Sequence, residues 1–85
     1  MSMSFQDIVK IGDGRAIVLC FAEDDYGKKF FHYIISDRES IKQMYHDYDH
    51  KKEVDFSAYG QIIHSGWGEK PTAEDEKFVR ETFGK

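Results

Sequence analysis

With 85 residues, 40% of them hydrophobic and 15% aromatic, the chain is long enough for one domain with a single core and too short for two. Its formal net charge of −4 repels a phosphate backbone at long range and disfavours nucleic acid as a partner. One cysteine cannot form an internal disulfide, and no stretch has the apolar length of a membrane span. We therefore expect one small cytoplasmic globular domain over residues 1–85, with residues 1–4 disordered and no membrane partner.

The first half of the chain predicts an antiparallel meander of three strands. Segments 5–11 and 15–23 flank Gly12-Asp13-Gly14, a turn of the kind that closes a tight hairpin. Residues 16–22 are apolar throughout, which is typical of a central strand covered on both faces. The polar segment 23–29 then leads through a flexible glycine into a third strand over residues 30–36.

A helix is predicted next, because the hydrophobic period changes after residue 36. Ser36 and Glu39 have the spacing of a capping box at a helix start. An apolar stripe of helical spacing follows, made of Ile41, Met44, Tyr45 and Tyr48.

A fourth strand is expected around residues 61–65 and a second helix after Pro71. Residues 55–59 can form a helical turn before the strand, and Gly60 can mark a bulge. Thr72 is a suitable cap for the last helix and Gly84 a suitable stop. Its acidic first turn is Glu74, Asp75 and Glu76, and its predicted core face is Phe78, Val79 and Phe83.

The element order predicts an α+β fold: a three-stranded antiparallel meander followed by α-β-α. We expect a four-stranded sheet with both helices on one face. The pattern leaves open whether the fourth strand pairs with the third or with the first.

The segment MYHDYDHKK, residues 44–52, places His46 and His50 four residues apart, a spacing at which two imidazoles can share a zinc ion. A catalytic zinc needs a third protein ligand and a structural one a fourth. On a helix with the stripe given above, both histidines project from the opposite, solvent side. The preferred interpretation is a solvated helix end, with no cofactor and no metal; a metal site at His46 and His50 is the alternative.

No standard catalytic motif is present, so we expect a protein that is not an enzyme. His32 and His64 lie in apolar strand contexts, and neighbouring strands can bring them together, but nothing near either supplies an evident nucleophile or carboxylate. Cys20 lies inside an apolar strand, where burial makes a thiol unreactive. The sequence around Ser65 lacks the glycine pattern of a nucleophile elbow.

Trp67 is the strongest candidate for a binding residue, because it lies between two glycines at the exit of a predicted strand and Trp is enriched at binding hot spots. The competing interpretation is a lid that folds back over the core between sheet and last helix. Tyr26, Asp24 and Asp25, at the predicted turn between the second and third strands, are secondary candidates.

We therefore expect a small acidic protein-binding module, such as an inhibitor, an immunity or anti-defence factor, an adaptor or an accessory subunit. Its partner is a larger protein, and the acidic residues can steer it to a basic surface. The alternative function is a small metal- or ligand-binding protein that uses surface or strand histidines. Homodimerisation through an uncovered strand edge also stays open. Base stacking on Phe30, Phe31 and Tyr33 is disfavoured, because the RNA-binding motif is missing and the charge is negative.

Overall fold

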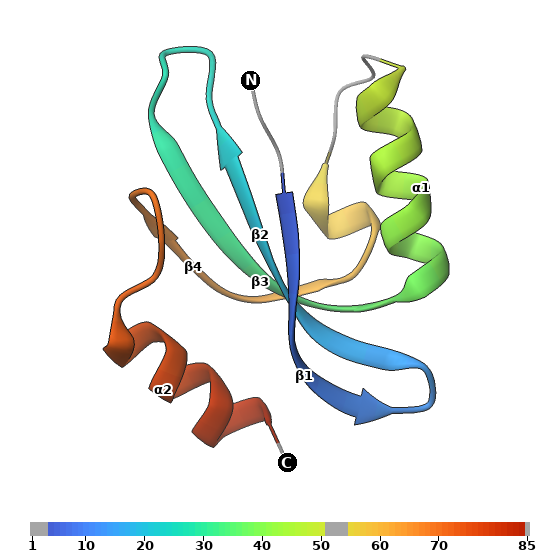
Figure 1. Ribbon diagram of the computed structural model, residues 1–85, viewed down its shortest axis with the longest axis vertical. Helices are drawn as coiled ribbons and strands as arrows, with labels where there is room; N and C mark the ends of the chain where they lie inside the picture. Colours follow the sequence, from blue (N-terminus) through green and yellow to red (C-terminus); the bar gives the residue numbers. More distant parts are fainter. Residues whose placement is uncertain (1–3, 51–54, 85) are drawn as a thin grey trace.

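The computed structural model describes residues 4–50 and 55–84 (Figure 1). Its elements follow in the predicted order: β1 (Ser4–Gly12), β2 (Arg15–Glu23), β3 (Lys29–Asp37), α1 (Arg38–Asp49), the short 3-10 helix η1 (Phe56–Ala58), β4 (Gln61–Trp67) and α2 (Ala73–Phe83). The α+β class and the meander followed by α-β-α are thus confirmed. Of the residues expected to be disordered, 1–3 lie outside the described residues, and Ser4 begins β1. None of the described helices is long and apolar enough to span a bilayer.

The four strands form one antiparallel sheet in the order β1-β2-β3-β4, so the fourth strand pairs with the third. The predicted hairpin between β1 and β2 is present: Asp13 and Gly14 have φ angles of 55° and 75°, as the tightest hairpin turns require. In β4, the register against β3 skips Ile63, which makes a bulge there and not at Gly60.

The two helices cover opposite faces of the sheet, which corrects the expectation of one shared face. Met44 of α1 packs against Val18, Cys20 and Ile34. Val79 of α2 belongs to a separate cluster on the other side. The members of that second cluster are Ile17, Leu19, Phe31, Tyr33 and Val79.

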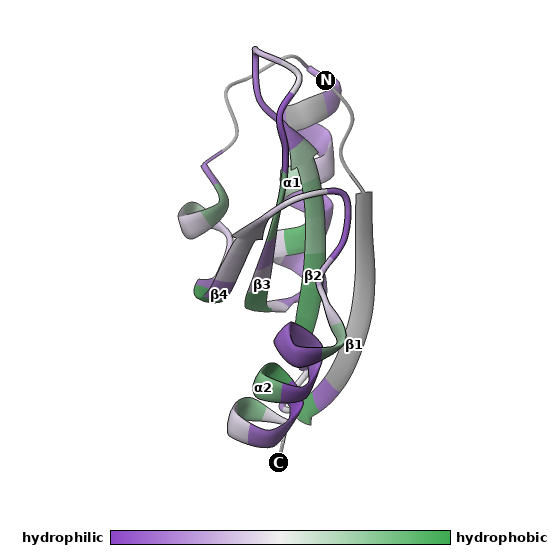
Figure 2. Ribbon diagram, turned by 90° about the vertical axis from the view of Figure 1, so that its left-hand side faces the viewer, coloured by the Kyte–Doolittle hydropathy of each residue, from purple (hydrophilic) through white to green (hydrophobic). Residues whose placement is uncertain are grey.

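The cause is the continuous apolar run in β2. Successive strand residues point to opposite faces, so Ile17 and Leu19 serve one layer while Val18 and Cys20 serve the other. Each layer needs a helix to exclude water. Figure 2 shows α2 in front of the strands and α1 behind them, with β2 coloured as hydrophobic. We call the two sides the α1 face and the α2 face.

The start of α1 also differs from the prediction. Asp37 caps the helix, because its Oδ1 accepts a hydrogen bond from N of Ser40 at 2.7 Å. Ser36 is instead the last inward residue of β3; it is 5% exposed and donates its hydroxyl to the carbonyl oxygen of Tyr59 at 2.6 Å. The predicted capping box at Ser36 and Glu39 is therefore wrong by one residue, since the serine hydroxyl fixes the chain before β4.

The predicted helical turn before β4 is η1, and it closes the α1 face. The hydroxyl of Tyr59 donates to the carboxylate of Asp47 in α1, a bond that raises the pKa of the tyrosine. A Cβ at Gly60 would overlap the backbone oxygen of Ile35, so the glycine permits close approach of the chain to β3. These contacts hold η1 between α1 and the sheet.

The second helix has the predicted ends. Thr72 and Asp75 form a capping box, and N of Gly84 donates to the carbonyl oxygen of Arg80 at 3.0 Å. Val79 is fully buried, as expected. Phe78, assigned to the core by its period, is 47% exposed, because it lies at the side of the helix and packs on His64 and Phe83.

Candidate functional site

Trp67 lies at the end of β4 on the α1 face with 63% of its surface exposed. Its ring centroid is 5.8 Å from that of Phe30, the residue opposite it in β3. Phe30 in turn meets the ring of Phe56 in η1, with centroids 6.3 Å apart. The lid interpretation is therefore wrong: the ring packs on β3, on the face away from α2, and leaves most of its surface in solvent.

The turn between β2 and β3 adjoins this tryptophan. Nζ of Lys28 lies 4.2 Å from the centroid of the Trp67 ring, a cation–π distance. Tyr26, two residues earlier in the same turn, is 96% exposed. We call Tyr26, Lys28, Phe30, Phe56 and Trp67 the Trp67 surface.

Asp24 is a structural residue of that turn. Its Oδ1 accepts hydrogen bonds from the backbone N atoms of Tyr26 and Lys28, at 2.9 and 2.8 Å. An aspartate that bonds the backbone two residues on is the usual way such a turn is fixed. Of the two predicted acidic contact residues, Asp25 is exposed in the turn, whereas the carboxylate of Asp24 is already used.

A second link joins the turn to the exit of β4. Nζ of Lys29 and Oε1 of Glu69 form an ion pair of 2.8 Å, which raises the pKa of the lysine and lowers that of the glutamate. N of Gly68 donates to the carbonyl oxygen of Lys29 at 2.9 Å. Both groups of the ion pair are largely in water, so they hold position more than they stabilise the fold.

The histidine pair at the C-terminal end of α1, with His46 in the helix and His50 directly after it, is exposed, as predicted. The ring centroids of His46 and His50 are 4.1 Å apart, and Nδ1 of His50 donates to the carbonyl oxygen of His46 at 2.8 Å. Within residues 4–50 and 55–84, no group of three His, Cys, Asp or Glu side chains is placed to hold a metal. The alternative metal site thus has two ligands in this part of the chain, fewer than zinc requires.

The two strand histidines do not meet, because they lie on opposite faces of the sheet. His32 is on the α1 face, where a hydrogen bond of 2.5 Å joins its Nδ1 to Oγ of Ser65 and its ring contacts Phe56. Burial lowers the pKa of His32, which favours the neutral ring. None of the described carboxylates is bonded to it.

His64 is on the α2 face. Its Nε2 is 2.8 Å from Oδ1 of Asp75, and its ring lies 5.1 Å from that of Phe78. The hydrogen bond from His64, and then the one from Thr72, lowers the pKa of Asp75. The pair of His32 and Ser65 and the pair of His64 and Asp75 therefore lie on opposite faces of the sheet. Because the sheet separates them, these four residues do not form a catalytic triad.

Both pairs were missed from the sequence. The pair of His32 and Ser65 follows once the register of β3 against β4 is known, but hydrophobic pattern alone left the neighbour of β4 open. The pair of His64 and Asp75 depends on how α2 docks across the sheet, which no local signal encodes.

No family model matches the chain, and no curated protein or solved structure is detectably similar to it. The Trp67 surface must therefore be judged by its own geometry. It is an exposed aromatic group held on strands and on a turn whose backbone is fixed by hydrogen bonds.

Proposed function

We propose that this protein is a small non-enzymatic binding module that acts by occupying a surface of a larger protein partner. The Trp67 surface is the contact region, with Trp67 as its central anchor and Tyr26 and Asp25 at its margin. The observation that carries the proposal is the 63% exposure of a tryptophan that is nevertheless held in place by Phe30 and Lys28.

Rigid, exposed aromatic side chains favour tight binding, because little rotamer freedom is lost when the partner covers them. Trp67 projects from a paired strand and packs on Phe30, so its orientation is largely set in the free protein. Lys28 lies over the ring, where a partner carboxylate or backbone carbonyl can bond its ammonium group. The net charge of −4 steers the module toward a partner whose surface is basic around the contact region.

The test compares three forms of the protein: the native chain, Trp67→Ala, and Phe78→Ala as a matched control. Phe78 is also an exposed aromatic residue, but it lies on the α2 face. We expect affinity capture from a lysate of the source organism to retain a partner on the native chain and on Phe78→Ala. The purified partner should bind Trp67→Ala more weakly by about 2 kcal/mol or more, as for other hot-spot residues.

Equal binding of the partner by a folded Trp67→Ala variant would remove Trp67 from the contact region. Loss of binding in both variants would extend the contact to the α2 face or indicate a general loss of structure, and circular dichroism of each variant distinguishes the two.

A further inference from the structure

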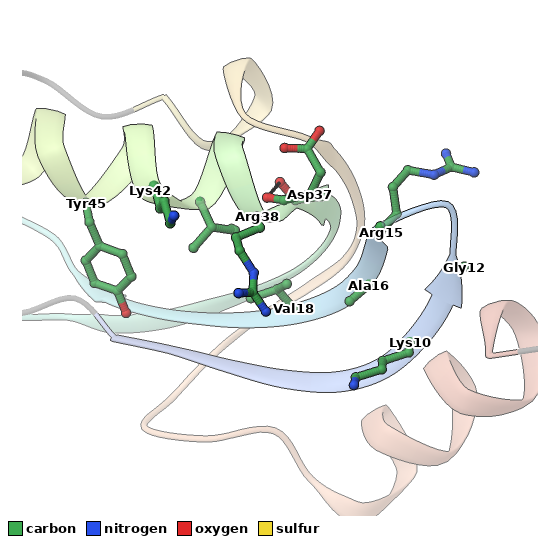
Figure 3. A pocket seen from close by; sticks show the side chains of 12 residues that line it. Lys10, Gly12, Arg15, Ala16, Val18, Asp37, Arg38, Lys42 and Tyr45 are labelled. Atoms are coloured by element: carbon green, nitrogen blue, oxygen red, sulfur yellow. Dashed lines mark hydrogen bonds between the residues drawn. The ribbon is translucent and has the colours of Figure 1, made fainter.

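A cavity of about 540 Å³ lies on the α1 face, near the edge of the sheet that β1 forms and away from the edge that β4 forms. It is bounded by α1, by the β1–β2 hairpin and by the end of β3 (Figure 3). Its volume falls in the usual range of small-molecule sites, about 300–1,000 Å³. The Trp67 surface, on β4 and the β2–β3 turn, contributes none of its lining residues.

The lining of the cavity is basic, although the protein as a whole is acidic. Lys10, Arg15, Arg38 and Lys42 line it, against one carboxylate, that of Asp37. Figure 3 shows Arg38 extending from α1 toward the strands and Lys10 on the facing strand β1, whereas Arg15 points away. Lys10, Arg38 and Lys42 thus all line the same cavity.

These cations have no ion-pair partner within the residues that the structure describes. The one lining carboxylate does not neutralise them, because Asp37 points away from the strands and its Oδ1 accepts the hydrogen bond of the α1 cap. Like charges gathered around a hollow repel one another, so a bound anion would remove an unfavourable interaction as well as gain new hydrogen bonds.

The rest of the lining is apolar and aromatic. Ala16 and Val18 of β2 and Ile41 of α1 contribute hydrophobic surface, and Tyr45 extends from α1 toward the strands. Tyr45, which belongs to the predicted core stripe of α1, is 38% exposed because it faces this cavity. An organic body can contact this wall while an anionic group meets the cations.

We propose that this cavity binds a small organic phosphate of about nucleotide size, with its phosphate groups held by Lys10, Arg38 and Lys42 and its flat organic part against Tyr45, Val18 and Ile41. Guanidinium and ammonium groups are the usual phosphate ligands of proteins, and an aromatic ring at their side suits a base or another planar group. This site shares no residue with the Trp67 surface, so the proposed phosphate binding is tested independently of the proposed protein binding.

The overall charge favours a small ligand over a long nucleic acid. Each additional phosphate of a polymer that extends beyond the cavity meets the field of a molecule with net charge −4. A ligand confined to the cavity meets the local cations at short range, where the screening by salt is weakest.

The test is calorimetric titration of the full chain with ADP, with adenosine and pyrophosphate as partial ligands. We expect saturable one-site binding of ADP that is tighter than that of either part. Arg38→Gln and Lys42→Gln should each weaken it roughly tenfold or more, the usual effect of losing a hydrogen bond to a charged group.

Two control variants remove the same charge elsewhere. Lys70→Gln affects an exposed residue shortly before α2, and Lys77→Gln affects an exposed residue of α2. Both should leave the ADP affinity within about twofold of the native value. Amide NMR shifts on ADP addition should concentrate at residues 16–18 and 38–45.

The proposal is overturned if ADP and pyrophosphate show no saturable binding at millimolar concentration, or if Arg38→Gln and Lys42→Gln bind as the native protein does. Equal affinities for pyrophosphate and ADP would overturn the assignment of Tyr45 and the apolar wall to the ligand. NMR shifts centred on residues 26–30 and 67 would place the ADP site at the Trp67 surface instead.

Discussion

At the scale of single residues, the carboxylate of Asp75 has two structural roles. One carboxylate oxygen bonds His64 of β4, and the other accepts hydrogen bonds from N and Oγ1 of Thr72 at the start of α2. The same side chain therefore caps the helix and ties it to the sheet. Its pKa is lowered from the ordinary value of 3.8, first by His64 and then by Thr72.

The lowered pKa predicts the pH dependence of one variant, Asp75→Asn. The folded state holds the carboxyl proton more weakly than the unfolded state, so the ionised group stabilises the fold above pH 3.8. This stabilisation is lost as the pH falls through the lower pKa of the folded state. We expect the variant to be less stable than the native protein by about 1 kcal/mol at pH 7, in line with other helix caps.

Urea unfolding at a series of pH values measures this difference, and it should shrink toward zero below pH 3.8. Glu74→Gln, an exposed carboxylate in the same helical turn, is the control and should show a smaller difference. A deficit for Asp75→Asn that stays constant into strong acid would show that the charge is not its cause.

At the scale of elements, the packing of β4 on β3 depends on a residue without a side chain. Gly66 lies opposite Phe31, and a Cβ at Gly66 would overlap the ring of that phenylalanine, which is buried beside α2. The aromatic ring occupies the space over the glycine. Strand β4 is thus matched to β3 by a large residue facing a small one.

This match predicts that Gly66→Ala is destabilising, by about 1–3 kcal/mol, because the ring must leave its place in a packed core. Thermal or urea unfolding gives the value. A double variant with Phe31→Leu tests the cause, since the smaller side chain removes the overlap. We expect the two substitutions together to cost less than the sum of their separate effects; strict additivity would contradict the proposed overlap.

Elements were the scale at which the sequence was most informative. The hairpin at Asp13-Gly14 and the capping of α2 by Thr72 follow from local chemistry and were predicted correctly. The start of α1 was predicted one residue early because Ser36 has two uses, a helix cap or a bond to Tyr59, and tertiary contacts decide between them. The exposure of Trp67 was left open for the same reason.

At the scale of the whole molecule, the sheet divides the core into two layers, one under each helix. The expectation of both helices on one face conflicted with a feature of the sequence itself, the unbroken apolar run of β2, which requires cover on both faces. The basic cavity could not be predicted, because Lys10 is far from Arg38 and Lys42 in the sequence and only the approach of α1 to the first hairpin brings them together.

The two layers share β2 and β3, so we predict that they unfold together. Met44→Ala, on the α1 face, should cost about 2–5 kcal/mol, the usual result of emptying a buried methionine site. Val79→Ala weakens the α2 layer in the same way. In both variants the fluorescence of Trp67, which reports on the α1 face, and the helical circular dichroism signal should change at the same midpoint.

Separate midpoints in Val79→Ala, with helix lost before the tryptophan signal changes, would contradict this coupling. The native protein provides the reference, and it should give one coincident transition. The comparison needs no added probe, since the chain has a single tryptophan.

The bulge at Ile63 has a consequence for how the protein behaves at high concentration. An outermost strand with a regular pleat is a template on which further chains can deposit, and β4 carries exposed Ile62 and Trp67. The extra residue breaks the regular spacing of donors and acceptors midway along the strand, so an incoming extended chain cannot stay aligned over its whole length. The bulge thus makes the exposed, partly apolar edge strand β4 a poorer template for fibrous aggregation.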